Sequence, residues 1–245
     1  MLNSEFCIMT DCIILAGGKG TRLRNVVSDV PKPMAPINGR PFLEIQLEYL
    51  ATQNIGRVIL ASGHMSEKIT GHFGHTFHGM QILHQVEEKP LGTGGAILRA
   101  LRLIETETFL LINGDTFFPI NLDKLIEFYK QNGANADMLI AAFAADKADR
   151  YGALSLQKDV TYLEKLSTQK APIGSLANGG TYLCNTQKWL ELSQDIDHSD
   201  FVSVEDDLIS LMLHQGAKIL VKKFSEPLID IGVPEDYSKA QLVLE

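Results

Sequence analysis

The stretch CIILAGGKGTRLRNVVSDVPK, at residues 12–32, decides how this chain is organised. Its first five residues form an apolar run that predicts a buried strand, and a loop rich in glycines and cations follows. Glycine takes positive φ without strain, so the N–H groups of such a loop can converge on phosphate oxygens. The loop predicts an anion site in a chain of net charge -8, and a tight turn with solvated basic side chains is the alternative. The cations are Lys19, Arg22, Arg24 and Lys32.

The spacing of this loop excludes two common phosphate-binding motifs. The loop of nucleoside triphosphatases needs a lysine and a hydroxyl residue after its last glycine, whereas Thr21 and Arg22 follow Gly20 here. A dinucleotide-binding loop opens a helix, which Pro31 and Pro33 would interrupt. What remains is Arg22 together with Lys32, whose backbone the flanking prolines restrict. Two cations held in this way suit a triphosphate.

The hydrophobic pattern predicts an α/β fold. Apolar runs at 12–16, 57–61, 80–84, 108–112 and 137–144 predict strands, and amphipathic stretches at 41–53, 66–73, 95–104 and 121–131 predict helices between them. This alternation is typical of a parallel sheet covered on both faces, with ligands at the carboxyl ends of its strands. The less regular second half predicts strands near 152–156, 160–164, 179–184 and 218–224 and helices near 203–214 and 234–244.

Composition limits the class of protein. A chain of 245 residues with 45% hydrophobic content can form one domain with a sizeable core, which we expect here. It has no apolar run of eighteen residues, and its start lacks the features of a signal peptide, so we expect a soluble, cytoplasmic protein with no membrane partner. The excess of acids argues against a nucleic-acid partner. Cys7, Cys12 and Cys184 suggest neither a disulfide framework nor a zinc site.

The motif Gly18-x-Gly20-Thr21-Arg22-Leu23 with Pro31-Lys32-Pro33-Met34 closely resembles the signature of the sugar-1-phosphate nucleotidylyltransferases, also called nucleotide-sugar pyrophosphorylases. The family's usual Pro-Leu-Thr reads Asn25-Val26-Val27 here. Residues 24–37 are most similar to the branch that activates D-glycero-α-D-manno-heptose 1-phosphate with GTP. Matching motifs follow in family order over nearly the whole chain: 88–95, 113–115, 151–152, 164–165, 178–180 and 230–232.

This resemblance implies a fold and a pathway. The fold is a Rossmann-like, mixed, mainly parallel sheet flanked by helices, the nucleotide-diphospho-sugar transferase fold. It implies a single domain over 1–245, with a nucleotide-binding part at about 11–145 and a smaller, sugar-phosphate-binding β part at about 146–245. Relatives also suggest a homodimer, and the branch implies nucleotide-sugar biosynthesis for lipopolysaccharide or capsule.

Two groups of binding residues are implied by the same resemblance. Glu88, Gly92 and Thr93 would lie near the nucleobase, although a simple helix entry is the alternative for the glycines. A surface ion pair, a turn and core packing are the alternatives for the sugar-side motifs. The nucleotide would contact Leu15, Ala16, Gly17, Gly18, Gly20, Thr21, Glu88, Gly92, Thr93 and Gly114. The sugar phosphate would contact Tyr151, Gly152, Glu164, Lys165, Asn178 and Gly180.

Two aspartates in apolar surroundings predict a magnesium site. Asp115 follows the apolar run 108–112 and a glycine, and Asp230 lies in the run Leu228-Ile229-Asp230-Ile231. Mg²⁺ takes one or two carboxylates together with phosphate oxygens, and an unpaired carboxylate in such a setting is costly. For either aspartate alone a turn or a helix cap is the alternative. For the acids at 205–207 we expect a helix start, because acids complement its positive end.

These residues predict phosphoryl transfer without a protein nucleophile. A sugar 1-phosphate would attack the α-phosphorus of the triphosphate and expel pyrophosphate, so the protein mainly positions two polyanions and offsets their repulsion. Arg22 would hold the departing phosphates, Lys32 the α-phosphate and Lys165 the sugar phosphate, with Mg²⁺ on Asp115 and Asp230. A mannose-1-phosphate guanylyltransferase, or a uridylyl- or thymidylyltransferase acting on a hexose phosphate, stays open. So does a regulatory subunit that senses nucleotide sugars without turnover.

Overall fold

The computed structural model describes most of the chain. Thr21, which was predicted to contact the nucleotide, lies outside the described residues, as do Lys19 and Arg24 of the opening loop. The backbone alone is described for 168–170. The described residues are 10–18, 20, 22–23, 26–133, 135–145, 151–157, 161–170, 172–197 and 201–244.

The parallel part of the sheet comes from the first half of the chain. Strand β1 (Thr10–Leu15) lies between β4 (Ile55–Ser62) and β7 (Thr108–Asn113) and pairs with both in parallel. Strand β6 (Met80–Val86) pairs in parallel with β4, and β5 (Thr76–Phe77) pairs antiparallel with β6 at the edge. Both faces of these central strands are covered, which is why they read as nearly continuous apolar runs.

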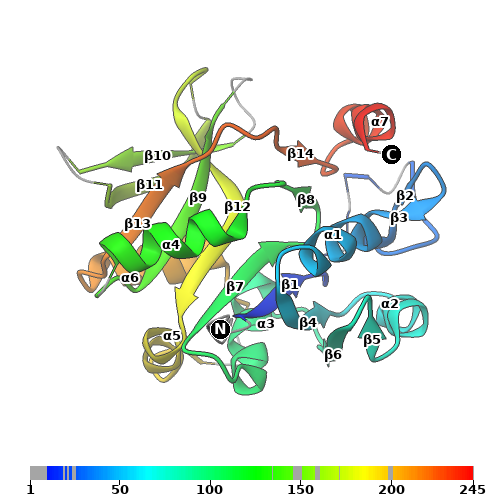
Figure 1. The fold of residues 1–245 in the computed structure, drawn as a ribbon, viewed down its shortest axis with the longest axis horizontal. Helices are drawn as coiled ribbons and strands as arrows, with labels where there is room; N and C mark the ends of the chain where they lie inside the picture. The colour runs from blue at the N-terminus through cyan, green and yellow to red at the C-terminus, as the bar shows by residue number, and fades with distance from the viewer. Residues whose placement is uncertain are drawn as a thin grey trace, which may run out of the picture.

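The second half of the chain extends the same sheet in mixed directions (Figure 1). Strand β12 (Leu176–Asn185) runs antiparallel to β7 and to β9 (Met138–Ala144), and β13 (Ile219–Lys223) lies parallel to β9. Strands β10 (Gly152–Leu156) and β11 (Leu163–Lys170) follow at the far edge. Within the described residues one ten-stranded sheet therefore passes through both halves. This continuity supports the predicted single domain, which stays a prediction.

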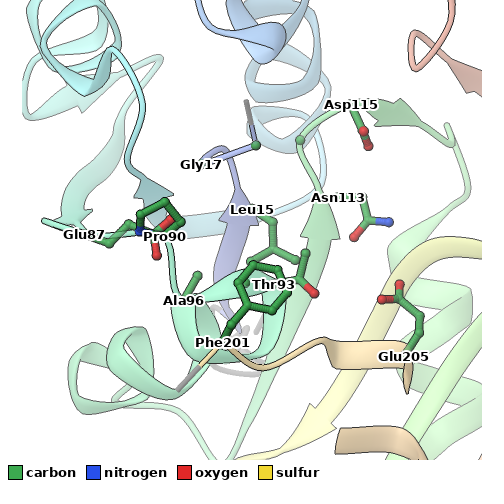
Figure 2. Close-up of a pocket in the computed structure, with 13 residues that line it drawn as sticks. Leu15, Gly17, Glu87, Pro90, Thr93, Ala96, Asn113, Asp115, Phe201 and Glu205 are labelled. Atoms are coloured by element: carbon green, nitrogen blue, oxygen red, sulfur yellow. The ribbon is translucent and has the colours of Figure 1, made fainter. Parts of the chain in front are cut away.

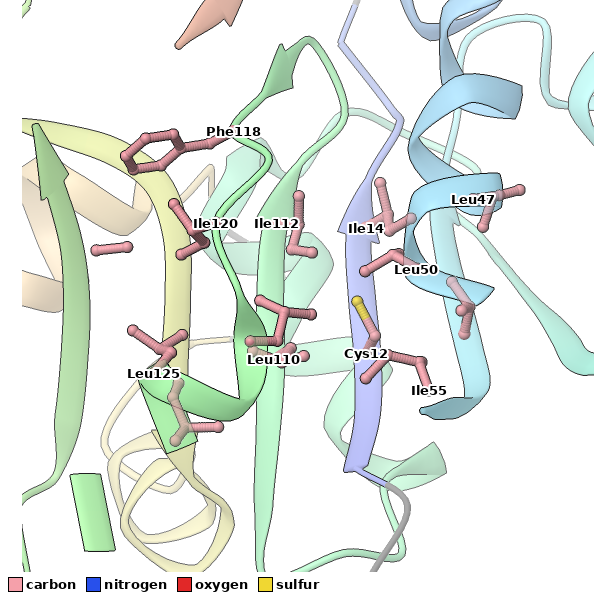
Figure 3. Packing of buried hydrophobic residues seen from close by; sticks show 14 of the residues in the cluster. Cys12, Ile14, Leu47, Leu50, Ile55, Leu110, Ile112, Phe118, Ile120 and Leu125 are labelled. Atoms are coloured by element: carbon pink, nitrogen blue, oxygen red, sulfur yellow. The ribbon is translucent and has the colours of Figure 1, made fainter. Parts of the chain in front are cut away.

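Helices cover both faces of the sheet because successive strand residues point to opposite sides. In β1, Cys12 and Ile14 belong to one buried cluster and Ile13 to the other. Figure 3 shows α1 beside the first cluster, to which Leu47 and Leu50 belong, with the Leu50 side chain reaching toward β1. On that side lie α1 (Phe42–Ala51), α2 (Ser66–Phe73) and α4 (Leu122–Asn132). On the other side lie α3 (Gly92–Ala100), η2 (Leu101–Leu103), α5 (Thr186–Ser193) and α6 (Ser210–His214).

A third, smaller cluster joins the two ends of the described chain. Helix α7 (Pro234–Val243) packs there beside residues of α1 and the buried Leu23 of the opening loop. The Tyr237 hydroxyl donates to the carbonyl of Pro36 at 2.6 Å, and Figure 1 shows α7 near the short strands of that region. The short elements are η1 (Lys32–Met34), β2 (Pro36–Ile37), β3 (Arg40–Pro41), β8 (Thr116–Phe117) and β14 (Ile229–Asp230).

The predicted α/β fold with a mixed sheet between helices is confirmed, although the two-residue strands β2, β3, β5, β8 and β14 were not predicted and three longer elements differ. Helix α5 was not predicted, because Trp189 and Leu192 are its buried residues and its apolar stripe is short. The strand expected near 160–164 begins and ends later, as β11. The helix expected near 203–214 begins as a π-helical turn, η3 (Val204–Ile209), before α6. Among the described residues, no helix is both long enough and apolar enough to span a membrane.

Candidate functional site

Two neighbouring cavities open at the carboxyl ends of β1 and β7. Their walls share three residues: Asn113, Asp115 and Glu205. The first cavity, of about 420 Å³, is shown in Figure 2. Its described lining is Leu15, Gly17, Gly18, Glu87, Pro90, Gly92, Thr93, Ala96, Asn113, Gly114, Asp115, Phe201 and Glu205. The second, of about 440 Å³, is lined by Arg22, Lys32, Asn113, Asp115, Thr116, Tyr151, Gly152, Leu166, Ser167, Asn178, Gly180, Glu205, Asp206, Leu228, Asp230 and Gly232.

A close backbone approach brings Asp115 to the glycine-rich loop. The parallel register of β1 and β7 places Leu15 opposite Asn113. The amide of Gly114 then donates to the carbonyl of Leu15 at 3.0 Å. A Cβ on Gly114 would lie 2.4 Å from that carbonyl oxygen, so a larger residue could not make this contact. The Asp115 carboxylate therefore lies just beyond the end of both strands.

A buried glutamine on α1 fixes the turn that carries Asp115. The side chain of Gln46 is 3% exposed, and its Nε2 donates to the carbonyls of Asn113 at 3.0 Å and Thr116 at 2.7 Å. These two bonds lie on either side of Asp115. Gln46 was not predicted as a site residue. A polar residue on the apolar stripe of a predicted helix is nevertheless a sequence signal for a buried hydrogen-bonding role.

The second aspartate reaches the same wall from the other end of the chain. Strand β14 pairs antiparallel with β8, so that Asp230 lies opposite Thr116. The amide of Ile231 donates to the carbonyl of Asp115 at 3.0 Å. The Asp230 carboxylate accepts a hydrogen bond from the Gly232 amide at 2.5 Å. A short backbone pairing therefore holds the two predicted carboxylates on one cavity wall.

Both predicted cations line the second cavity. Lys32 forms an ion pair with Asp115, and its side chain is 10% exposed. A Cβ on Gly232 would lie 3.3 Å from the Lys32 ammonium, so the lysine also lies beside the Asp230 segment. Gly20, at φ +57°, packs against the Lys32 stem, and Arg22 is exposed at the cavity. The structure thus brings Arg22 and Lys32 to the cavity wall that carries both aspartates.

The two carboxylates suit a cation that also takes oxygens from a ligand. Hard divalent ions accept one or two carboxylates and complete their shell with phosphate oxygens and water. Over the part of the chain that the structure describes, no group of three or more acids, histidines or cysteines is arranged to hold a metal. Asp115 and Asp230, which line one cavity, supply the one or two carboxylates that such an ion takes from a protein.

The glycines at 92–95 admit another segment of the chain. Val202 pairs with this turn in both directions: its amide donates to Leu91 at 2.8 Å, and its carbonyl accepts from Gly94 at 2.8 Å. The Val204 amide donates to the Thr93 hydroxyl at 2.9 Å. A Cβ on Gly92 would lie 2.3 Å from the Val202 oxygen. We call residues 201–205, bound in this way, the 201–205 strap.

Glu87 is the acid of the first cavity that is not shared with the second, to which Asp115 and Glu205 also belong. It is half-buried, accepts from the Leu91 amide at 3.1 Å, and approaches the backbone at Gly17. Burial raises the pKa of Glu87, against the lowering effect of the Leu91 hydrogen bond. Glu88, which was predicted to lie near the base, is exposed and is not among the described residues that line either cavity. The chain leaves β6 just before these residues, where the alternation of a strand no longer predicts which side chain faces inward.

Of the other eight described residues that were predicted to contact the nucleotide, six line the first cavity and two do not. Ala16 is fully buried under the loop, and Gly20 lies beside Lys32. Leu15, Gly17, Gly18, Gly92, Thr93 and Gly114 line the cavity.

Four of the six predicted sugar-phosphate residues line the second cavity: Tyr151, Gly152, Asn178 and Gly180. Glu164 and Lys165, on β11, are exposed and are not among the described lining residues.

Glu205 lies in the first turn of η3, as the expected helix start requires, and it also lines both cavities, which was not predicted. Its carboxylate accepts from the Tyr182 hydroxyl at 3.2 Å, and the Asn178 amide donates to that hydroxyl at 2.6 Å. Burial raises the pKa of Glu205, and the charges of Asp206 and Asp115 raise it further. The helix start expected at 205–207 is confirmed, since all three acids lie in the first turn of η3, and Ser203 caps this turn by accepting from the Asp206 amide at 3.2 Å. Other lining residues that the sequence analysis did not identify are Pro90, Ala96, Thr116, Leu166, Ser167, Phe201, Leu228 and Gly232.

Replacing Gly92 with alanine tests the close contact between the 201–205 strap and the turn at 91–94. Gly92 and Gly79 both have positive φ, +78° and +83°, but a Cβ on Gly79 meets nothing within 4 Å. We expect Gly79→Ala to cost about 1 kcal/mol of unfolding free energy from backbone strain alone. Gly92→Ala should cost several-fold more and weaken binding of a nucleoside triphosphate. Denaturant unfolding measures the stability of both variants, and nucleotide titration measures their affinity. Equal losses in Gly79→Ala and Gly92→Ala would show that the contact between Gly92 and Val202 is not important.

Comparison with known proteins identifies the family. The family model described as nucleotidyl transferase matches residues 11–245. A D-glycero-alpha-D-manno-heptose 1-phosphate guanylyltransferase from Aneurinibacillus thermoaerophilus is 38% identical over 242 residues, covering 96% of this chain and 98% of the relative. An enzyme of the same name from Campylobacter jejuni is 40% identical over 231 residues, covering 92% and 96%.

A solved structure agrees with this assignment. The crystal structure of HddC from Yersinia pseudotuberculosis complexed with GMP-PN has a TM-score of 0.83 and 33% identity, and the match covers 97% of this chain and all of that one. Nucleotidyltransferases of this family generally use a divalent metal ion. The match over nearly the whole sequence and the shared fold lead to one conclusion: this chain belongs to the nucleotidyl transferase family.

Proposed function

We propose that this chain transfers GMP from GTP to D-glycero-α-D-manno-heptose 1-phosphate, releasing pyrophosphate and forming the GDP-sugar. The observation that carries the proposal is the meeting of two cavities at Asn113, Asp115 and Glu205, with Arg22 and Lys32 on the wall of the second. A transfer between two phosphorylated substrates needs two adjoining compartments with cations close to where they meet, and Lys32 reaches that point through its ion pair with the shared Asp115. The relatives named heptose 1-phosphate guanylyltransferases support the choice of substrates.

The first cavity suits a guanine nucleoside. Leu15, Pro90 and Ala96 provide apolar contacts, and Glu87 provides a carboxylate at the edge. The Watson–Crick edge of guanine presents two adjacent N–H donors, whereas adenine and uracil each present an acceptor beside a donor. An ionised carboxylate only accepts hydrogen bonds, so it pairs best with guanine. The neighbouring structure complexed with GMP-PN is consistent with this preference.

The second cavity would hold the sugar phosphate. Asn178 and the backbone at Gly152 and Gly180 offer hydrogen-bond partners for sugar hydroxyls. Lys165 stays the predicted cation for the sugar phosphate, and it precedes Leu166 and Ser167, which line the cavity. Two ionised substrates placed this close repel each other. The rate acceleration would therefore come from holding them in line and offsetting their charge.

Arg22 and Lys32, on the wall of the second cavity, would each offset a different part of this charge. Arg22, at the exposed side, would hold the departing β- and γ-phosphates. Lys32 would contact the α-phosphate, whose negative charge grows as the incoming oxygen bonds and the pyrophosphate oxygen leaves. The Lys32 ammonium is already aimed at this point by Asp115. No proton transfer is needed, because the attacking phosphate oxygen is ionised.

Mg²⁺ is the ion that we propose for Asp115 and Asp230, because it prefers hard oxygen ligands and retains phosphate and water in its shell. When bound, it would offset charge on the triphosphate. Three sequence-based expectations stay predictions beside this proposal: a cytoplasmic location, a homodimer, and the division into nucleotide-binding and sugar-binding parts.

A substrate matrix tests the proposed reaction. The purified chain is offered four nucleoside triphosphates with the 1-phosphates of D-glycero-D-manno-heptose, mannose and glucose, and pyrophosphate is measured. We expect the highest kcat/KM for GTP with the heptose phosphate. A higher value with mannose 1-phosphate or with UTP would favour the alternative transferases. Binding of GTP without pyrophosphate release from any pair would favour a nucleotide-sugar sensor.

Two neighbouring glutamates offer a matched test of guanine recognition. Glu87→Gln replaces an acceptor oxygen with an N–H donor that opposes guanine's own donors. We expect kcat/KM for GTP to fall on the order of tenfold to a hundredfold, the range for a hydrogen bond to a charged group. Glu88→Gln makes the same chemical change at an exposed site and should leave GTP use unchanged. If Glu88→Gln has the larger effect, the residue that the family resemblance implies reads the base instead.

Variants of Lys32 and Asp115 test the roles proposed for them in contacting the α-phosphate and in holding Mg²⁺. Lys32→Ala should lower kcat on the order of a hundredfold or more, as for the loss of one preorganised oxyanion contact. Asp115→Asn should strongly reduce the response of the rate to Mg²⁺ concentration. Lys188→Ala removes an exposed lysine on α5 and serves as the control. Near-normal turnover in Lys32→Ala, or an unchanged Mg²⁺ response in Asp115→Asn, would remove that residue from the proposed site.

A further inference from the structure

Phe201 is an exposed aromatic residue at the wall of a ligand cavity. Its side chain is 71% exposed although the residue lines the first cavity. A phenyl ring left in water forgoes the favourable free energy of burying its apolar surface. Figure 2 shows the ring in front of α3, near Thr93 and Leu15. A ligand that fills the cavity would cover this ring.

The backbone that carries Phe201 is fixed. The next residue, Val202, exchanges backbone hydrogen bonds with Leu91 and Gly94, both at 2.8 Å, and Val204 is bound to Thr93. Val202 is 6% exposed. The position of Phe201 is therefore determined by the glycine-rich turn at the base cavity.

The other apolar residues that line the first cavity offer no aromatic surface on which a flat ligand could stack. Its other apolar contacts come from the aliphatic side chains of Leu15, Pro90 and Ala96. Among the described lining residues, Phe201 supplies the aromatic ring. Stacking on an aromatic ring needs a flat π-face and no hydrogen-bond pattern, so it adds affinity to whatever reads the edge of the base.

We propose that Phe201 stacks on the nucleobase and forms the outer wall of the base site. This inference rests on the proposed function, because it takes the base to occupy the first cavity. The two residues then divide recognition: Glu87 reads the edge of the base, and Phe201 covers one face. A purine offers a larger π-face than a pyrimidine, so the ring favours GTP and ATP over UTP.

Nucleotide titration without sugar phosphate tests the stack apart from turnover. Phe201→Ala should weaken GTP binding on the order of tenfold, the scale of one base–aromatic contact. It should weaken UTP less and leave inorganic triphosphate unchanged, because triphosphate has no base. Phe201→Tyr keeps the ring and should retain the affinity for GTP. Leu242→Ala, at an 85% exposed site on α7, is the control for loss of exposed apolar surface.

A tryptophan at the same position gives a direct signal. The chain contains one tryptophan, Trp189, which is fully buried. In Phe201→Trp the added indole should be quenched by GTP but not by inorganic triphosphate. The proposal is overturned if Phe201→Ala binds GTP as the wild type does, or if it weakens triphosphate to the same degree. Failure of the proposed function looks different, since the wild type would then release no pyrophosphate in the substrate matrix whatever Phe201 does.

Discussion

The hydrogen bond between the Gly114 amide and the Leu15 carbonyl is the contact on which the site depends. It joins the ends of two parallel strands at a distance that excludes any Cβ, and it places Asp115 beside the glycine-rich loop that follows β1. Two further contacts hold the same turn: Gln46 binds it from α1, and the Ile231 amide binds the Asp115 carbonyl. The carboxylate is thereby positioned by backbone atoms and a buried amide, which need no reorganisation when a charged ligand arrives.

The change of strand direction in the sheet explains how one site can have two compartments. The strands from the first half run parallel, so their carboxyl ends open on one edge, where the first cavity lies. Strand β12 is antiparallel to β7, and its first residues, including Asn178 and Gly180, therefore lie beside the end of β7. A further parallel strand could have brought only its final residues to this edge. Antiparallel pairing lets a later segment build the second cavity against the first.

Local patterns predicted much of this arrangement. The apolar runs predicted the strands, and the glycine and cation spacing of the opening loop predicted that Arg22 and Lys32 share an anion site. That Asp115 and Asp230 lie together was expected from their apolar surroundings, but the pairing of β14 with β8 that accounts for it involves two-residue strands without a pattern of their own. Gln46, Phe201 and Glu205 were missed as site residues for a related reason. Each reaches the site through tertiary contacts that no motif encodes, and of the three only Gln46 leaves a signal in the sequence, as a polar residue on the apolar stripe of a predicted helix.

The 201–205 strap gives the glycines at 92–95 a structural role in addition to the one expected at a ligand. Such a sequence before a helix suggests that the backbone approaches a ligand, yet here Gly92 and Gly94 make room for the backbone of Val202. One short segment then forms part of both cavities, with Phe201 at the first and Glu205 at the junction. Glu205 is in turn tied through Tyr182 to Asn178 in the second cavity. A displacement of the strap would therefore alter both walls together, which makes the packing of two glycines a condition for binding either substrate.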